Sequence, residues 1–92
     1  MIRSFKHKGL ERFFRTGSKA GIPAASAARI EKILDALDIS VQPADMNLPG
    51  MVYHSLTGPM AGRFSVRVTG NWRITYAWDG IDAIDVDLVD YH

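Results

Sequence analysis

The 92-residue sequence contains no cysteine and no long uninterrupted run of apolar residues. The lack of cysteine excludes disulfide bonds and thiolate metal sites, and it is typical of a reducing compartment. Charged residues interrupt every apolar stretch near the N-terminus, so the sequence predicts neither a signal peptide nor a membrane-spanning helix. We therefore expect a cytoplasmic protein that does not engage a membrane.

Sequence motifs for cofactors and metals are missing as well. The chain has no glycine-rich phosphate loop and no nucleophile elbow. Its three histidines, His7, His54 and His92, lie far apart in the sequence, and no cysteine accompanies them. We expect no metal and no cofactor.

The chain is long enough for one compact core, and its charge is distributed unevenly. We expect a single domain spanning residues 1–92. The net charge is +1, yet residues 1–40 carry eight basic and four acidic side chains, and residues 41–92 carry three basic and six acidic ones. The basic half could bind phosphate or an acidic partner, although a solvated helix face explains the same charges.

Apolar spacing predicts a helical hairpin in the first half, after a short strand over residues 1–5. Residues 8–16 have helical spacing of apolar positions, and Gly17 is a typical helix end. Pro23 suits the first position of a second helix. The apolar stripe of that helix consists of Ala27, Ile30, Ile33, Leu34 and Leu37. Residues 40–49 read as a loop or a single turn.

Alternating patterns in the second half predict four strands, near residues 51–56, 64–69, 72–78 and 83–90. One face of the last three strands is apolar and is expected to cover the core under the helices. It comprises Phe64, Val66, Val68, Trp72, Ile74, Tyr76, Ile84, Val86 and Leu88.

The polar face of these strands depends on how they are paired. A three-residue connection, 79–81, keeps the two faces separate and pairs Arg73 with Asp87, while the preceding hairpin pairs Arg67 with Arg73. On one interpretation Arg73 is only the cross-strand partner of Asp87. On the other, two arginines that share one carboxylate leave a guanidinium available for a phosphate.

The sequence closes with Asp90, Tyr91 and His92, whose side chains are typical of acid-base chemistry. A strand-like run leads directly into this triplet, so a sheet is expected to anchor it. The alternative is a solvated end, since chain termini are often poorly ordered.

Three segments together resemble the HigB toxins of bacterial toxin-antitoxin pairs, within the RelE/ParE superfamily. They are residues 2–10, residues 71–75 and the final triplet. The resemblance implies an α+β, RelE/ParE-like fold, with two N-terminal helices packed on one face of a small, mainly antiparallel sheet. It also implies a ribosome-dependent endonuclease that cleaves mRNA in the A site of the 70S ribosome. The implied partner is a HigA-like helix-turn-helix antitoxin, through which alone the toxin would contact DNA.

The family's site maps onto His54, Arg73, Asp90, Tyr91 and His92. Attack of a ribose 2′-hydroxyl on the adjacent phosphate requires a base, an acid and positive charge at the phosphorane. The resemblance therefore implies proton transfer by the two histidines, charge stabilisation by the arginine, and orienting roles for the other two. It does not say which histidine is the base. Each residue also has an ordinary structural interpretation, such as a strand histidine or a tyrosine that closes the core.

The segment after His54 departs from the family pattern, because relatives carry a basic loop there. Thr57 and Met60 occupy positions of missing positive charge, and Arg63 is the nearest basic residue that could compensate. Weaker activity is one expectation. Two other functions stay open: a gyrase poison like the ParE branch, which the two histidines argue against, and a weakly toxic protein that acts mainly within a repressor complex.

Overall fold

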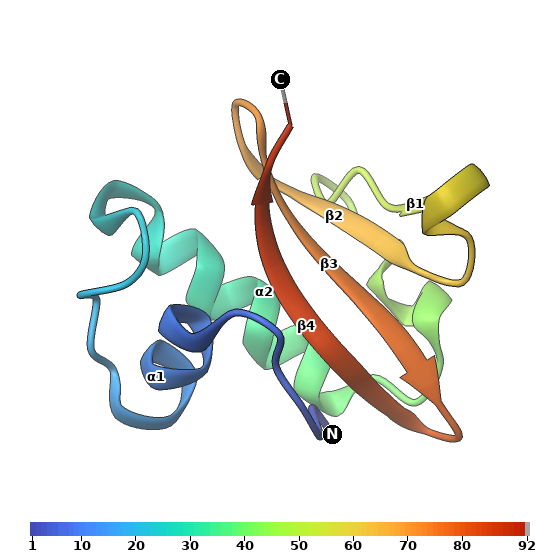
Figure 1. Cartoon of the computed structure of the whole chain (residues 1–92), viewed down its shortest axis with the longest axis horizontal. Helices are drawn as coiled ribbons and strands as arrows, with labels where there is room; N and C mark the ends of the chain where they lie inside the picture. Colours follow the sequence, from blue (N-terminus) through green and yellow to red (C-terminus); the bar gives the residue numbers. More distant parts are fainter. Residues whose placement is uncertain (92) are drawn as a thin grey trace.

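The computed structural model describes residues 1–91, which form an α+β arrangement (Figure 1). The helices are α1 (Lys8–Thr16) and α2 (Ala27–Ile39), and the strands are β1 (His54–Ser55), β2 (Phe64–Thr69), β3 (Trp72–Asp79) and β4 (Asp82–Asp90). Three 3₁₀ turns lie between them: η1 (Ala24–Ser26), η2 (Pro43–Met46) and η3 (Gly58–Met60). The four strands pair antiparallel in the order β1-β2-β3-β4. Within residues 1–91, no helix is long and apolar enough to cross a membrane.

Helix α1 begins and ends where the sequence predicted. Its N-cap is His7, whose Nδ1 accepts a hydrogen bond of 2.9 Å from the N–H of Leu10. Gly17 ends the helix in the left-handed region, at a φ of 80°. The hydrogen bond from Leu10 gives His7 a structural role as the helix cap. The first turn of α1 also packs closely on the loop before α2, because a Cβ on Gly9 would lie 2.5 Å from the carbonyl oxygen of Gly21.

Helix α2 starts later than the sequence predicted. Pro23 is the residue before η1, in extended conformation, and regular α-helix begins only at Ala27. The predicted apolar stripe is buried as expected, from Ala27 to Leu37. Pro23 thus introduces the helical segment without being its first residue.

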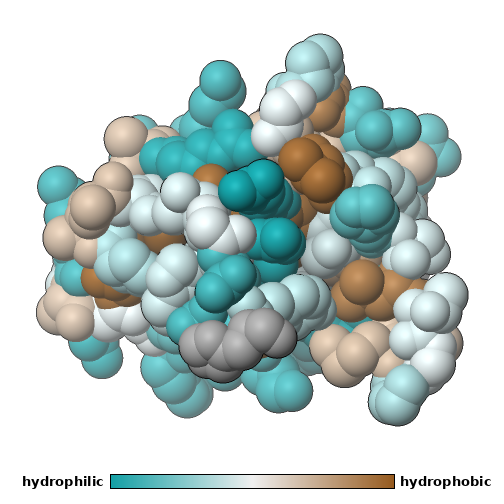
Figure 2. Space-filling model, turned by 90° about the horizontal axis from the view of Figure 1, so that it is seen from above, coloured by the Kyte–Doolittle hydropathy of each residue, from teal (hydrophilic) through white to brown (hydrophobic). Residues whose placement is uncertain are grey.

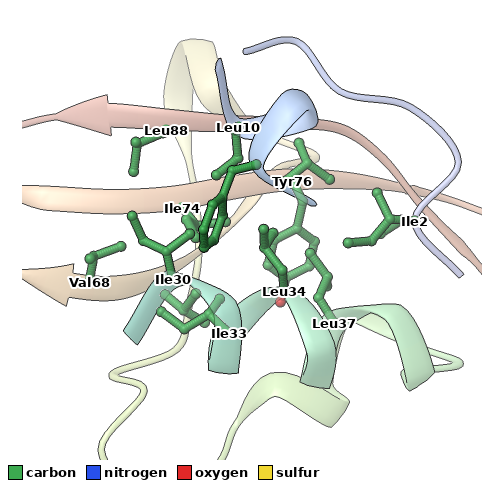
Figure 3. Packing of buried hydrophobic residues seen from close by; sticks show 14 of the residues in the cluster. Ile2, Leu10, Ile30, Ile33, Leu34, Leu37, Val68, Ile74, Tyr76 and Leu88 are labelled. Carbon is green, nitrogen blue, oxygen red and sulfur yellow. The ribbon is translucent and has the colours of Figure 1, made fainter. Parts of the chain in front are cut away.

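A single hydrophobic core joins both helices to the strands. Figure 3 shows side chains of α2 pointing toward those of β2, β3 and β4, with Tyr76 between them. Burial raises the pKa of Tyr76 well above its ordinary value, so its phenol stays neutral, and its O–H donates to the carbonyl of Pro43 over 3.1 Å. The first residues of the chain close one edge of this core, since Ile2 and Phe5 form isolated parallel bridges to β4. The predicted first strand is therefore reduced to two bridges.

The β2–β3 register agrees with the prediction, whereas the β3–β4 register does not. Arg67 lies opposite Arg73, as expected. However, Arg73 pairs with Val89, and Asp87 pairs with Thr75. The predicted Arg73–Asp87 pair is wrong because the hairpin turns through residues 80–81 alone, which places Asp79 opposite Asp82.

A β-bulge in β4 explains how a two-residue turn still keeps the apolar face intact. Asp85 has a φ of 51° and sits where the pairing of β3 with β4 shifts. A bulge adds one residue to one strand and so inverts the alternation of side chains beyond it. As a result Ala83 is fully buried in the core, whereas Ile84, which the sequence assigned to the core face, is not part of it.

Strand β1 is the least regular part of the sheet, because the predicted strand at 51–56 shrinks to two residues. Val52 interrupts it with a φ of 50°. The segment is nevertheless tied to its surroundings. The carbonyl of Met51 accepts from the N–H of Arg67, and Arg29 of α2 donates to the carbonyls of Gly50 and Arg67.

Candidate active site on the outer face of the sheet

Successive side chains of a strand point to opposite faces, so the residues that alternate with the core positions form what we call the outer face. By their pairing, it holds His54, Ser65, Arg67, Arg73, Thr75 and Asp87. The row from β1 to β4 runs His54, Ser65, Thr75, Asp87, and a second row contains Arg67, Arg73 and Val89. The outer face is therefore polar and rich in arginine.

His54 is exposed on β1 and is positioned by its neighbour Tyr53. The ring of Tyr53 stacks on Phe64, with centroids 6.1 Å apart and planes 9° from parallel, and Phe64 in turn contacts Tyr76. Burial raises the pKa of Tyr53, so its phenol stays neutral near neutral pH. The stacked rings of Tyr53 and Phe64 hold the two-residue strand β1 in place. Because successive strand residues alternate, the imidazole of His54 lies on the opposite face of the sheet from these rings.

Arg73 is held by backbone oxygens and not by a carboxylate. Its Nη1 donates to the carbonyls of Gly70 and Trp72, over 2.8 and 3.1 Å. Asp87, its predicted partner, instead accepts from the N–H of Leu88. The positive charge of Arg73 therefore lacks an ion pair within residues 1–91, where ion pairs involve Arg3, Arg15 and the N-terminal amine.

The pairing of β2 with β3 places two residues of like charge, Arg67 and Arg73, opposite each other in the backbone register. Such cross-strand pairs destabilise a sheet by a fraction of a kcal/mol, about 0.2–1. The arrangement is unfavourable in the free protein, and an anion bound between the two guanidinium groups would relieve it.

Tyr91 approaches Arg73 at the end of β4. Its N–H donates to the carbonyl of Asn71 over 2.9 Å, which continues the pairing one residue past the strand. The guanidinium carbon of Arg73 lies 6.0 Å from the centroid of the Tyr91 ring, a cation–π contact, and Tyr91 as a residue is 39% exposed. The structure thus brings these two predicted site residues together.

The other predicted site residues are placed differently. Asp90 is the exposed last residue of β4 and pairs with Trp72, so the alternation directs it to the opposite side from Arg73. His92 lies outside the described residues. His54 is two strands away from Arg73 and lies in the row of Thr75, two residues along β3, so their backbones are about 12 Å apart at the usual strand dimensions. Within residues 1–91 no hydrogen bond or ring contact joins them.

Arg63 lies nearer the centre of the outer face than the sequence indicated. Its Nη2 donates to Oγ1 of Thr75 over 2.9 Å and to the carbonyl of Asp85 over 2.7 Å. From the sequence, Arg63 was expected only to compensate for the positive charge missing from the loop after His54. The contact of Arg63 with β4 depends on the bulge at Asp85, whose carbonyl accepts the hydrogen bond. The alternation of polar and apolar residues does not reveal this bulge.

The loop that departs from the family pattern is an exposed turn. Thr57 is the extended residue before η3, and Met60 is 39% exposed. No basic residue lies in η3. Within residues 1–91, no group of three histidine, cysteine, aspartate or glutamate side chains is placed to hold a metal ion.

Figure 2 looks down on the molecule from above the view of Figure 1, where the β2–β3 turn and the end of β4 lie. Strongly hydrophilic side chains form a band across the middle of this view, with apolar groups beside it. The side of the molecule that carries the β2–β3 turn and the end of β4 is therefore polar over much of its surface.

Comparison with known proteins decides the family. A family model described as the RelE-like toxin of the type II toxin-antitoxin system HigB matches residues 3–92. The chain belongs to this HigB-like toxin family. It is 39% identical to the Endoribonuclease HigB of Proteus vulgaris over 92 residues, which cover both chains completely. It is 30% identical to Toxin HigB-1 of Vibrio cholerae over 84 residues, 88% of each chain.

The fold of this HigB-like toxin is also found in a solved structure. The YoeB-YefM complex from Staphylococcus aureus contains a chain that matches with a TM-score of 0.57 at 18% identity, over 100% of this chain and 98% of the other. At that identity the likeness shows the fold alone. The protein is thus an α+β toxin of a type II toxin-antitoxin system, a class that works with an antitoxin partner.

Proposed function

We propose that this HigB-like toxin is a ribosome-dependent endoribonuclease, which cleaves mRNA in the A site of the 70S ribosome and so inhibits translation in the cytoplasm. One observation carries the proposal: Arg73, without a carboxylate partner in residues 1–91, contacts the exposed ring of Tyr91 on an arginine-rich face. The full-length similarity to a protein named an endoribonuclease supports it.

The chemistry assigned to the site is attack of a ribose 2′-hydroxyl on the adjacent phosphate. Arg73 would stabilise the charge of the phosphorane, and Tyr91 would position a nucleotide by stacking or donate a hydrogen bond. His54 and His92 would act as base and acid, and Asp90 would orient an imidazole. We further propose that residues 1–92 act as one RelE-like domain, in which both helices cover the core face and leave the outer face to the ribosome and mRNA.

The separation between His54 and Arg73 is compatible with this scheme. Two strand spacings and a two-residue offset along β3, about 12 Å in all, leave room for one nucleotide between a histidine on β1 and the cation on β3. Within residues 1–91, Arg73 donates its hydrogen bonds through Nη1. The remaining donors of its five N–H groups are thus available to phosphate oxygens.

The decisive experiment replaces histidines and measures single-turnover cleavage on programmed ribosomes. His54→Ala and His92→Ala should each reduce the rate by roughly 10²- to 10⁴-fold, the usual range for acid-base groups, while the protein stays folded. His7→Asn is the matched control, because asparagine also caps helices and His7 serves as the cap of α1. Parental rates in both site variants would refute the catalytic assignment.

A second test concerns Tyr91. If its ring stacks on a base, Tyr91→Phe should retain more activity than Tyr91→Ala, whereas an essential hydroxyl would make the two equally poor. Equal rates for the parent and both variants would remove Tyr91 from the site.

The proposed antitoxin is a HigA-like helix-turn-helix protein, through which alone the toxin would contact DNA. The basic first half offers contacts for its acidic groups. Arg12 and Lys19 are exposed and are the best candidates, whereas Arg15 pairs with Glu11, and Arg29 is bonded to backbone carbonyls. A small protein encoded beside this one should co-purify with it and relieve growth arrest. Failure of every neighbouring protein to do so would contradict this part of the proposal.

The same growth experiment separates the other functions. Transcripts cut within codons would support the endonuclease. DNA breaks without transcript cleavage would indicate a gyrase poison, and neither kind of damage would indicate a protein that acts mainly in a repressor complex.

A further inference from the structure

Arg63 spans the outer face from the start of β2 to β4. It immediately precedes Phe64, the first residue of β2, yet its guanidinium bonds to Thr75 on β3 and to the bulged residue Asp85 on β4. The side chain is half-buried. Residues of three strands therefore fix the position of the Arg63 guanidinium, next to the row of outer-face residues that begins at His54.

Both acceptors of Arg63 are neutral oxygens. The carboxylates nearby in the sheet are engaged elsewhere: that of Asp85 contacts the hydroxyl of Ser4, and that of Asp87 accepts from the N–H of Leu88. No ion pair of Arg63 occurs among the described residues. Within the described residues no carboxylate neutralises the charge of this half-buried side chain, so an oxyanion could pair with it without displacing a protein group.

A purely structural clamp would not need this charge. Donating to a hydroxyl and a carbonyl requires only neutral N–H groups, which cost less to desolvate than a guanidinium. Moreover, both bonds come from Nη2, so Nη1 and Nε keep donors for a ligand. Because the fork is already fixed, little side-chain entropy would be lost when it binds a planar or tetrahedral oxyanion.

We propose that Arg63 binds a phosphodiester group of RNA, as a second phosphate site next to that of Arg73. By the strand register, the row of Ser65 and Thr75 lies between Arg63 and Arg73, and the guanidinium of Arg63 bonds to the fully buried Thr75. The proposal rests on the proposed function, which supplies RNA as the substrate. It also explains how the toxin retains positive charge near His54 although the loop from Thr57 to Met60 has none.

The test measures binding of a short RNA whose 2′-hydroxyl at the cleavage position is replaced by hydrogen, so that no reaction occurs. Arg63→Gln should weaken binding about tenfold, as expected for loss of a charge-assisted bond. The slope of log affinity against log salt should become shallower by about 0.7, the value for one phosphate contact on a single strand. Arg63→Lys should keep the slope but lose affinity, because lysine lacks the fork.

The control is Arg3→Gln, since Arg3 is an exposed arginine that is already ion-paired, with Asp79 and Asp82 at the β3–β4 turn. It should change neither affinity nor slope. Unchanged RNA affinity and slope in Arg63→Gln, with a lowered melting temperature, would overturn the proposal and leave Arg63 as a clamp.

A second measurement does not depend on the stability of any variant. In the wild-type protein with ¹⁵N-labelled arginine, the Nε resonance of Arg63 should shift as the same RNA is added, and that of Arg3 should not. Absence of a shift at Arg63 would refute the site. Both measurements use RNA that cannot react, so they are independent of catalysis. RNA bound through Arg63 by a protein that leaves the mRNA on programmed ribosomes uncut would contradict the proposed function alone.

Discussion

The two faces of the sheet are built from the same strands but are stabilised in different ways. On the core face, Ile74, Tyr76 and Val86 are fully buried among apolar neighbours. On the outer face, Thr75 is also fully buried, yet what reaches its hydroxyl is the guanidinium of Arg63. Burial there depends on a long polar side chain whose position is set by hydrogen bonds.

This difference separates stability from function along a single strand. The core positions of β3 stabilise the fold, and Arg73, which lies between two of them, carries the charge for the proposed chemistry. Neighbouring substitutions on β3 should therefore affect different measurements.

The largest effect is expected at Ile74, in the middle of the core face. Ile74→Ala should destabilise the protein by about 2–5 kcal/mol, because it removes buried methyl groups and leaves a cavity. That is a large fraction of the roughly 5–15 kcal/mol typical of a domain. Urea denaturation measures it. A cost below 1 kcal/mol would show that the core face is not as closely packed as its burial implies.

The next effect concerns Arg73, one residue away on the outer face. Arg73→Ala should lower the cleavage rate by about 10²- to 10³-fold, as does the loss of a group that stabilises transition-state charge. The free energy of unfolding should change by only about 0.5–1.5 kcal/mol, the usual contribution of a hydrogen bond. Single-turnover cleavage and urea denaturation of the same sample test both statements. Equal losses of stability at Ile74 and Arg73 would erase the distinction between the faces.

The bulge at Asp85 is predicted to have an intermediate effect on stability. Valine is strained at positive φ, so Asp85→Val should cost about 1–2 kcal/mol. Asp85→Asn is the control and should be nearly neutral, because asparagine tolerates this conformation. Thermal unfolding compares the two. Similar melting temperatures for both variants would show that the backbone conformation at Asp85 does not limit stability.

A smaller effect is expected when charge is restored to the loop. Thr57→Lys should raise cleavage about tenfold, equivalent to about 1.4 kcal/mol, with a steeper loss of activity as salt is added. Met60→Arg should act in the same direction, less strongly if Arg63 already supplies the charge. Rates and salt responses equal to the parent's in both variants would mean that the outer face needs no further cation.

The smallest effect is a pH dependence at Asp45, in the turn beside the core. The N–H of Val41, followed by the side chain of Gln42, holds the pKa of Asp45 below its ordinary value of 3.8. A depressed pKa contributes stability above the ordinary value and loses it as pH falls through the folded value. The difference in melting temperature between the parent and Asp45→Asn should therefore shrink below about pH 4. A difference that stays constant down to the acid limit of folding would contradict this assignment.

The sequence predicted those features that depend on burial. The limits of α1 and the register between β2 and β3 were correct, because apolar periodicity and the alternation of faces determine them. The N-cap role of His7 was not predicted, since a histidine cap leaves no distinctive pattern. The site itself resulted from the family resemblance, and its catalytic roles stay predictions.

The β3–β4 register could not be predicted from alternation. Regular strands would need a three-residue connection to keep Ile84 on the core face. The structure uses a two-residue turn and corrects the faces later, at Asp85. The left-handed conformation of Asp85 therefore decides that Arg73 pairs with Val89. The alternation of polar and apolar residues does not predict such a conformation.

The contact between Gly9 and Gly21 has a consequence for how the protein tolerates change. A Cβ on Gly21 would lie 2.6 Å from the Cα of Gly9, although Gly21 is exposed to solvent. Neither residue can gain a side chain unless the backbone of the other moves, so the two positions are expected to vary as a unit. In a saturation mutagenesis library selected for folding, this surface position should be as intolerant of substitution as the interior of the protein.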